Sequence, residues 1–377
     1  MFTSFKQRHL IPDIFFYLLF ISVALQFGYV AYYFIPFLYY KPKALSRADF
    51  PVSVIIAAHN EHHNLQQFLP AVLQQLYNNF EVIVVDDRST DDTQKILFEL
   101  SQQYQNLRII TITRTPPELN PKKFALTQGI AAARYEHLLF TDADCRPQGT
   151  NWINSVACGF YTDTAIVLGY SPYTDIYGFL NNLIRFETLV SAIQYFSFAI
   201  RGNSYLGVGR NLAYTKTCFY RTNGFEAHKN ILGGDDDLFV RDARDQNKVN
   251  IIFAEESQTI SIPKQTYLAW VIQKRRHMAV GRQYKMADKV RIGVFMLANI
   301  FFYLSLIILL FVETNLSGAG ILFGLRCIVM YTVYKFISQK LKESLSVALL
   351  PLLDLAYFLN YLILGVSVLM YNKVRWK

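Results

Sequence analysis

Charged residues are scarce in this chain of 377 residues, because Asp, Glu, Lys and Arg together make up only 17% of it. Soluble domains usually contain about 25%. Hydrophobic residues make up 52% of the chain, and they are clustered rather than evenly spread. This composition excludes a disordered chain and argues against a fully soluble protein, since clustered apolar residues need a core or a bilayer to cover them.

Cysteine patterns that would indicate a metal site or a disulfide scaffold are also missing. The four cysteines, Cys145, Cys158, Cys218 and Cys327, form no CxxC pair and follow no regular spacing. Three histidines lie beside Glu61, but not in the HExxH spacing of zinc enzymes. The sequence therefore predicts neither a structural zinc site nor a framework of disulfides.

What the sequence does have is long apolar runs at both ends. Ile14–Tyr40 is longer than the ~20 residues needed to cross a bilayer. Its length, its aromatic exit and the stop at Lys41 and Lys43 distinguish it from a cleavable signal peptide. We therefore predict an N-terminal transmembrane helix within residues 1–40. Residues 290–377 are predicted to hold about three more, in Val290–Val312, Gly320–Ile337 and Ser344–Tyr371.

Two charged residues, Arg326 and Asp354, fall inside these C-terminal runs. A charge inside a span costs a few kcal/mol, so both must face protein, water or each other. We favour a buried structural pair over a transport site. A further apolar and aromatic segment, Phe179–Ile200, is either a helix in the membrane interface or a core helix, and the sequence leaves both alternatives open.

Basic residues flank the apolar runs, and this placement explains the net charge of +9 better than binding to nucleic acid does. Those next to the central polar region are Lys41, Lys43, Arg47, Lys285, Lys289 and Arg291. By the positive-inside tendency they predict a cytosolic central region anchored in the cell (inner) membrane. Four spans would place both termini outside, yet these are basic as well, at Lys6, Arg8, Lys373, Arg375 and Lys377. The number and orientation of the spans therefore stay open.

The central region, residues 41–289, alternates short apolar runs with helical patterns. Predicted strands are Val52–Ala57, Phe80–Val85, Leu107–Thr113 and His137–Thr141, and predicted helices are Asn64–Gln75, one that begins near Thr90, and Lys122–Arg134. Runs such as VIVV do not alternate with polar residues, which indicates a parallel sheet covered on both faces. The predicted fold is therefore α/β, with ligands bound beyond the carboxyl ends of the strands.

Acidic residues follow two of these strands. The second strand leads into Asp86 and Asp87, and the fourth leads into Asp142 and Asp144. Two carboxylates two residues apart can bind one divalent cation, with water and substrate phosphates as the other ligands. We expect the two acidic ends at adjacent positions of one sheet. Helix capping remains the alternative for the acidic residues near Thr90.

Seven segments in a fixed order make a specific resemblance. They read VSVIIAAHNEHHNL, EVIVVDDRSTDDTQKI, KKFALTQGI, LLFTDADCRP, GVGRNLAY, GGDDDLFVRDA and QKRRH. Together they resemble the inverting glycosyltransferases of family 2, whose GT-A fold is a Rossmann-like sheet with a DxD metal motif. The resemblance covers roughly Val52–His277, and the terminal helices resemble those of membrane-embedded members, including polysaccharide synthases.

The resemblance implies a membrane-bound enzyme that moves a sugar from a nucleotide-diphosphate donor to a lipid-linked or glycan acceptor. Asp142 and Asp144 would hold Mg²⁺ or Mn²⁺, and Asp142 would also contact the donor. Residues that match the nucleotide-binding motifs are Ala58, Asn60, Glu61, Asp86, Asp87 and Lys122. A transporter is disfavoured because the polar region holds organised acidic clusters. A non-catalytic scaffold would be expected to have lost the metal or base carboxylates.

The resemblance also assigns the general base and the acceptor side of the site. The family's E-D-x-D/E-L pattern, aligned on Leu238, makes Asp235 the base, with Gly234 in place of the usual Glu and Asp236 as the alternative. Three adjacent carboxylates would raise one another's pKa unless a cation lies close. Residues that match motifs lining the donor or acceptor are Arg210, Asn211, Gln273, Arg276 and His277. His277 replaces the Trp of the QxxRW motif, which argues against a long polymer acceptor.

Overall fold

The computed structural model describes residues 2–370, and the side chains of residues 13–367. The basic residues named above near the two termini therefore lie outside the described side chains. The chain divides into two compact units. The sheet unit contains Lys41–Tyr177 and Phe198–Tyr284, and the helical unit contains the described residues up to Tyr40, Gly178–Ser197 and the described residues from Lys285 onwards.

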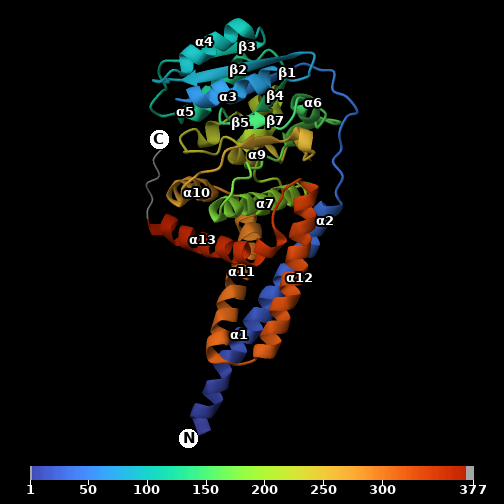
Figure 1. Cartoon of the computed structure of the whole chain (residues 1–377), viewed down its shortest axis with the longest axis vertical. Helices are drawn as coiled ribbons and strands as arrows, with labels where there is room; N and C mark the ends of the chain where they lie inside the picture. Colours follow the sequence, from blue (N-terminus) through green and yellow to red (C-terminus); the bar gives the residue numbers. More distant parts are fainter. Residues whose placement is uncertain (1, 371–377) are drawn as a thin grey trace. The chain divides into compact units, whose positions relative to one another are not determined.

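A seven-stranded sheet forms the centre of the sheet unit, in the order β3-β2-β1-β4-β7-β6-β8. Its strands are β1 (Val52–Ala58), β2 (Phe80–Asp87), β3 (Leu107–Ile112), β4 (His137–Phe140), β6 (Thr164–Leu168), β7 (Leu212–Thr215) and β8 (Lys248–Ile251). The first four strands pair in parallel, β7 runs antiparallel to β4 and β6, and β8 is parallel to β6. The predicted, mostly parallel sheet is confirmed (Figure 1).

The strand order corrects one expectation. Strand β1 lies between β2 and β4, so the two acidic strand ends occupy alternate rather than adjacent positions. A separate pair of short strands, β5 (Cys145–Pro147) and β9 (Thr259–Ser261), lies antiparallel beyond β4. Because β5 begins directly after Asp144, this pairing fixes the chain on the far side of the second acidic motif.

Helices cover both faces of the sheet, which explains the apolar runs without alternation. The helices of the sheet unit are α3 (His62–Leu73), α4 (Thr93–Gln103), α5 (Pro121–Ala132), α6 (Trp152–Ala157), α8 (Lys216–Arg221), α9 (Asp237–Ala243) and α10 (Tyr267–Gly281). Val52, Val54 and Ile56 point into one buried cluster with residues of α3, α4 and α6. Ile55 points the other way and contacts α5, where a Cβ on Gly129 would lie 2.8 Å from its Cγ2.

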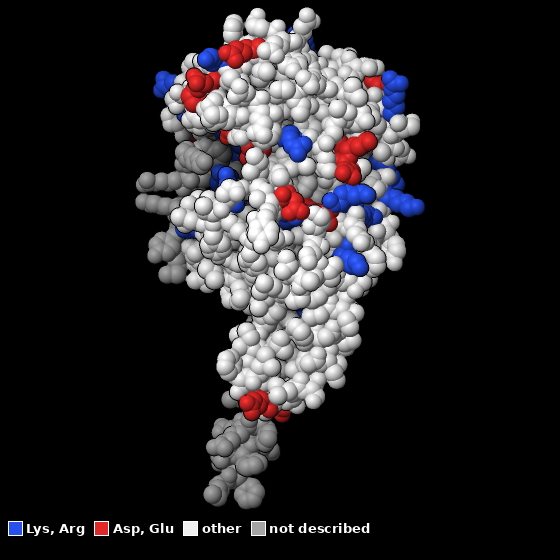
Figure 2. Space-filling view, viewed as in Figure 1, with Lys and Arg blue, Asp and Glu red and all other residues white. Residues whose placement is uncertain are grey.

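The helical unit contains α1 (Phe2–Tyr29), a π-helical turn (Val30–Phe34), α2 (Ile35–Tyr39), α7 (Phe179–Ile200), α11 (Met286–Val312), α12 (Leu316–Lys340) and α13 (Leu350–Met370). Among the described residues, five helical segments are long and apolar enough to cross a membrane, and four of them match the spans predicted from the sequence. On the displayed face, charged side chains gather over the sheet unit and are few over α1, α11 and α12 (Figure 2).

The fifth segment, α7, differs from the other four. Its most apolar window is 83% buried, against 22–39% for the others. Within the helical unit, Phe186 packs edge-on against Tyr334 and Tyr357, and the Arg185 guanidinium lies 2.9 Å from the Glu343 carboxylate. These contacts favour the core-helix alternative for Phe179–Ile200, because a lipid-facing helix keeps its apolar side chains exposed.

Arg326 and Asp354 form the buried ion pair expected of them, and neither side chain is exposed. The guanidinium also donates to Gln26 Oε1 (3.0 Å) and Asn299 Oδ1 (2.7 Å), while the Tyr303 hydroxyl donates to Asp354 Oδ2 (2.6 Å). The network joins α1, α11, α12 and α13. Paired and hydrogen-bonded in this way, the two charges are structural, as the sequence favoured.

Candidate active site

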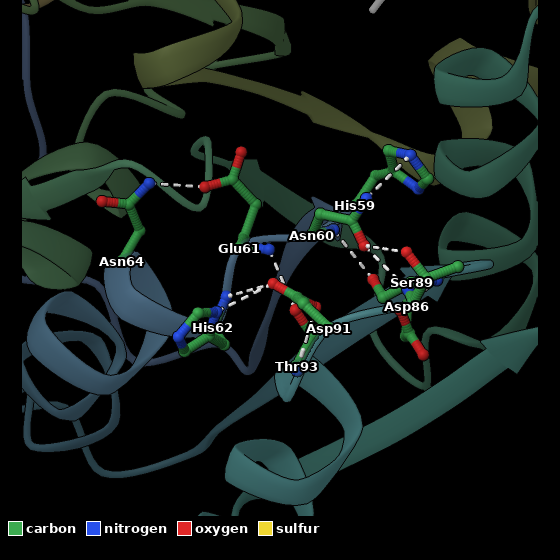
Figure 3. Close-up of polar contacts among 10 residues, drawn as sticks. His59, Asn60, Glu61, His62, Asn64, Asp86, Ser89, Asp91 and Thr93 are labelled. Atoms are coloured by element: carbon green, nitrogen blue, oxygen red, sulfur yellow. Dashed lines mark hydrogen bonds and ion pairs between the residues drawn. The ribbon is translucent and has the colours of Figure 1, made fainter.

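The loops that follow β1 and β2 are tied to each other by polar contacts (Figure 3). Thr90 N donates to Asn60 Oδ1 (2.7 Å), and Asn60 N donates to Ser89 Oγ (2.9 Å). Asn60 has a φ of 56°, a left-handed conformation that Asn tolerates better than most residues. Glu61 N donates in turn to Thr93 Oγ1 (2.9 Å). The Asn60 side chain therefore holds the two loops in register.

His62, one of the three clustered histidines, pairs with a carboxylate. Its Nδ1 lies 2.9 Å from Asp91 Oδ2 (Figure 3). Burial acts to raise the pKa of Asp91, but hydrogen bonds from Thr93 and His62 lower it to about 2. This contact gives Asp91 the local, helix-starting role that the sequence kept open for the acidic residues near Thr90.

The two acids at the end of β2 differ in what they contact. Both Asp87 oxygens accept hydrogen bonds from Arg88, at 2.8 and 3.1 Å, and Thr115 donates to one of them (3.3 Å). Asp86 is fully buried, and its Oδ1 accepts a bond from Ser89 N (3.3 Å). Among the described residues its Oδ2 has no hydrogen-bond partner. Asp86 Oδ2 is therefore a buried acceptor that no described group satisfies, whereas both Asp87 oxygens are paired with Arg88.

Lys122 brings three separate motifs together. Its Nζ lies 3.0 Å from Asp142 Oδ1 and 3.0 Å from Asp235 Oδ2. A pocket is lined by these three side chains together with Gly209 and Asp236, among others. Burial acts to lower the pKa of Lys122, but the charges of Asp142 and Asp235 outweigh it and raise the pKa well above its usual value. Lys122 is therefore a fixed cation between the end of β4 and the acidic segment before α9.

The three consecutive acids before and in α9 have different partners. Asp236 accepts from Gly209 N and from Asp237 N, both at 2.8 Å, and so caps α9. Asp237 accepts from Leu238 N (2.7 Å) and from the Tyr284 hydroxyl (2.6 Å). Asp235 lies against Lys122 instead. Of the three carboxylates, Asp235 is the one whose named side-chain partner is a cation.

These environments separate the pKa values of the three carboxylates. Burial acts to raise the pKa of Asp235, but the adjacent Lys122 charge lowers it below its usual value. Burial and then the charge of Asp235 raise the pKa of Asp236 to about 6. Burial and then the charge of Asp236 raise the pKa of Asp237 to about 7. Asp235 is thus the carboxylate of the three with the lowest pKa, and the one whose ionised form a neighbouring cation stabilises most directly.

The local backbone conformation explains why Gly234 stands where the family has a glutamate. Gly234 has a φ of 81°, and a Cβ there would lie 2.6 Å from Leu238 Cδ1. A side chain at this position would be strained and would collide with the first turn of α9. The departure from the pattern therefore follows from the conformation of the segment that leads into Asp235.

Asp142 and Asp144 fit a hard divalent cation. Burial and the charge of Asp142 raise the pKa of Asp144, and a shared cation would relieve this repulsion between the two carboxylates. In the part of the chain that the structure describes, no group of three or more His, Cys, Asp or Glu side chains could hold a metal ion. A cation here would therefore take its remaining ligands from water and substrate, as expected for phosphate-bound Mg²⁺.

The remaining predicted site residues lie on two elements. Arg210 stacks over the Tyr173 ring, at 4.2 Å from its centre, and donates to Ser171 O (3.0 Å). Its charge acts to lower the pKa of Asp144, which places it near the metal motif. Asn211 is buried, and its amide is used within the protein, since it donates to Tyr170 O and Ser257 O, both at 2.7 Å.

Gln273, Arg276 and His277 lie on α10, which is capped by the Thr266 side chain. His277 is exposed to solvent and lies near several cations. Desolvation, and then the charges of Lys274, Arg276, Arg210 and Lys122, lower its pKa well below the usual value. The ring is therefore neutral at physiological pH and lies within electrostatic range of Arg210 and Lys122.

Sequence reasoning missed the residues that support this site. Tyr284 hydrogen-bonds Asp237, and Thr115 hydrogen-bonds Asp87. Neither lies within a motif. Contacts of this kind join positions far apart in the chain, so no local spacing reveals them.

Comparisons with known proteins identify the family of one part of the chain. A family model, Glycosyl transferase family 2, matches residues 53–226. These residues are a family 2 glycosyltransferase domain. The resemblance found in the sequence is therefore confirmed, and the domain holds Asp86, Lys122, Asp142 and Arg210.

Two curated relatives match part of this chain. A poly-β-1,6-N-acetyl-D-glucosamine synthase of Staphylococcus epidermidis is 27% identical over 140 residues, which are 36% of this chain and 33% of that protein. A human dolichyl-phosphate β-glucosyltransferase is 33% identical over 103 residues, which are 25% of this chain and 31% of that protein. The match thus spans about a third of each of these relatives.

One solved structure is similar along nearly the whole chain. It is a mannosyltransferase of Pyrobaculum calidifontis in complex with GDP-Man and Mn²⁺, with a TM-score of 0.62 and 17% identity. The alignment covers 95% of this chain and 99% of that one. At this identity the likeness shows the fold alone, and it confirms the GT-A fold predicted for the glycosyltransferase domain.

Proposed function

We propose that this chain is a membrane-bound, metal-dependent, inverting glycosyltransferase. It moves a sugar from a nucleotide-diphosphate donor to a hydroxyl of a lipid-linked or glycan acceptor. The observation that carries the proposal is the position of Lys122, 3.0 Å from both Asp142 and Asp235 within one pocket. It joins the expected metal-binding end of β4 to the expected base.

Asp235 is the proposed general base. Inversion requires a base on the side of the sugar opposite the leaving group, where it takes the proton of the acceptor hydroxyl as that oxygen attacks the anomeric carbon. Asp235 is ionised because of Lys122, whereas both Asp236 oxygens accept backbone N–H groups. This difference favours Asp235 over Asp236, the alternative that the motif alone leaves open.

Asp142 and Asp144 would hold Mg²⁺ or Mn²⁺, which supplies charge neutralisation for the departing nucleoside diphosphate. The Mn²⁺ and GDP-Man of the Pyrobaculum structure support this class of donor and cation. Asp86 and Asp87 match the acids that contact the nucleotide in the family, and Arg276 suits the diphosphate because its guanidinium presents several N–H donors in a fixed geometry. Ala58, Asn60 and Glu61 form the neighbouring wall of the nucleotide site, with Asn60 holding the loop through Thr90.

The proposed organisation is a transmembrane helix in residues 1–40, a catalytic region in 41–289 and further transmembrane helices in 290–377. Nucleotide sugars are made in the cytosol, so the catalytic region would face the cytosol from the cell (inner) membrane, as its flanking basic residues suggest. The names of the two curated relatives, a polysaccharide synthase and a dolichyl-phosphate glucosyltransferase, represent the two proposed acceptor classes.

The test uses the purified full-length protein with a panel of UDP- and GDP-sugars and membrane lipid extract. We expect nucleoside diphosphate release that requires Mn²⁺ or Mg²⁺ and stops with EDTA. Asp142→Asn and Asp144→Asn should abolish release. Asp235→Asn should bind donor with wild-type affinity but lose transfer by roughly 10²–10⁴-fold, the usual effect of losing a general base.

Asp49→Asn is the matched control, because Asp49 is an exposed carboxylate paired with Arg47. It should release diphosphate at the wild-type rate. Full activity in Asp235→Asn would remove Asp235 as the base and direct the search to Asp236. Release that is unaffected by EDTA would reject metal dependence.

A further inference from the structure

Lys123 follows Lys122 on α5 but contacts a different part of the protein. Its side chain is 2% exposed, and its Nζ donates to His228 O (2.5 Å) and Ile231 O (3.1 Å). Next to it, Asn120 N donates to Lys229 O (2.9 Å). The first turn of α5 thus holds the chain at 228–231 by three hydrogen bonds.

The segment held in this way leads directly to the acids of the site. Between Ile231 and the start of α9 the backbone is neither helix nor strand. Gly233 and Gly234 have φ values of 79° and 81°, a left-handed region that glycine adopts without steric cost. The position of Asp235 therefore depends on two anchors, Lys123 before the glycines and the cap of α9 after them.

Burying an ammonium group costs desolvation free energy, and a neutral donor could bind the same two carbonyl groups at a lower cost. Burial lowers the pKa of Lys123 to about 8, although the charges of Asp235, Asp237 and Asp236 act to raise it. Its positive charge also acts to lower the pKa of Asp235. A neutral donor would hold the carbonyls without giving this electrostatic support to the neighbouring acids.

We propose that Lys123 is a positioning residue for Asp235. It anchors the 228–231 segment. This anchor fixes the path of the chain through Gly233 and Gly234, and so holds the Asp235 carboxylate beside Lys122. Lys123 itself touches neither donor nor acceptor. The inference rests on the proposed function, because it gives Asp235 the role of the base.

The experiment compares Lys123→Met with Lys216→Met in the full-length protein. Lys216, the first residue of α8, is the matched control. Its Nζ also donates to two carbonyls, Ala131 O (3.3 Å) and Ala133 O (2.7 Å), which lie at the C-terminal end of α5. Hydrogen exchange of the backbone amides in 229–238 is measured first, without substrate. We expect exchange there to be faster by about tenfold or more in Lys123→Met and unchanged in Lys216→Met.

Steady-state kinetics follow, with the nucleotide sugar that supports diphosphate release by the wild type. A misplacement of about 1 Å can reduce turnover by about 10²-fold. We therefore expect Lys123→Met to lower kcat by about 10- to 100-fold with the donor KM within about threefold of wild type. Lys216→Met should change neither. Lys123→Gln, which keeps an N–H donor on a shorter side chain, carries the same test if Lys123→Met does not fold.

Unchanged exchange in 229–238, or a kcat equal to that of Lys216→Met, would overturn the proposal. A rise in donor KM without a fall in kcat would also overturn it, because the lysine would then serve donor binding. If the wild type releases no diphosphate from any donor, the proposed function fails. The exchange comparison then still decides whether Lys123 anchors the segment.

Discussion

At the scale of single residues, identical side chains in this site differ in charge because their partners differ. Asp235, Asp236 and Asp237 are consecutive, yet the first contacts an ammonium group, the second backbone N–H groups and the third a tyrosine hydroxyl. The motif alone could name the acids of the site. The motif could not show which of these acids is charged, because the contacts that distinguish them come from Lys122 and Tyr284, which are distant in the sequence.

The raised pKa of Asp237 should be measurable through the pH dependence of the free energy of unfolding. Its pKa is raised to about 7 in the folded protein, by burial and then by the charge of Asp236. The folded state therefore binds this proton more tightly than the unfolded state, and the resulting stability is lost as the pH rises through 7. We expect wild-type protein to lose on the order of 1–3 kcal/mol from this group between pH 5 and pH 8.

Asp237→Asn should remove most of this loss, because an amide does not ionise and can still accept from Leu238 N. The measurement is the thermal midpoint of detergent-purified protein at pH 5 and pH 8, with wild type as the reference at each pH. A variant that loses as much stability over this range as wild type would contradict the raised pKa.

At the scale of elements, the sequence predicted what periodicity and strand ends can reveal. The four parallel strands and the helices α3, α4 and α5 follow from apolar runs and helical patterns in the sequence, although the cap of α5 at Asn120 and its start at Pro121 were not predicted. The later strands β6, β7 and β8 were not predicted. They have four or five residues each, and unlike the equally short β4 they do not lead directly into an acidic motif that marks the end of a strand. Strand order is also a property of tertiary packing, which explains why β1 between β2 and β4 was missed.

The buried network in the helical unit gives a prediction at this scale. Replacing Arg326 by Met leaves Asp354 buried without its cation, and breaking a buried pair in this way costs about 3–5 kcal/mol. We expect a clear drop in the thermal midpoint of the detergent-purified protein. The double variant Arg326→Met with Asp354→Leu should recover much of the loss, because it leaves no unpaired charge.

Arg47→Met is the control, since the Arg47–Asp49 pair is of similar length, 2.8 Å, but exposed. Exposed pairs contribute about 0–1 kcal/mol. Equal midpoints for Arg326→Met and Arg47→Met would show that the buried pair does not hold the helices together.

At the scale of the whole molecule, the apolar helices and the flanking basic residues give a testable orientation. If α11 and α12 cross the membrane, the link between them lies on the side opposite to the catalytic region. Ser317, in the first turn of α12, is exposed, as is Thr150 in the sheet unit. We expect a membrane-impermeant maleimide to label Ser317→Cys in intact cells, and Thr150→Cys only after permeabilisation.

Three of the native cysteines are buried and Cys327 is partly exposed, so Cys327→Ser serves as the labelling background. Labelling of Thr150→Cys in intact cells would place the catalytic region outside and reject the proposed orientation. Labelling of both positions only after permeabilisation would show that α11 and α12 do not carry the link across the membrane.

The chain path through α7 has a consequence for how the protein is made. Helix α7 lies within the glycosyltransferase domain in sequence, between β6 and β7, yet Arg185 on it binds Glu343, which follows α12. During synthesis, every proposed catalytic residue emerges before the partner that neutralises this arginine. A version shortened after α10 would keep every proposed catalytic residue. It would lose Glu343, which pairs with Arg185, and the aromatic residues that pack on the apolar side of α7. Trimming the two ends is therefore not expected to yield a water-soluble catalytic fragment.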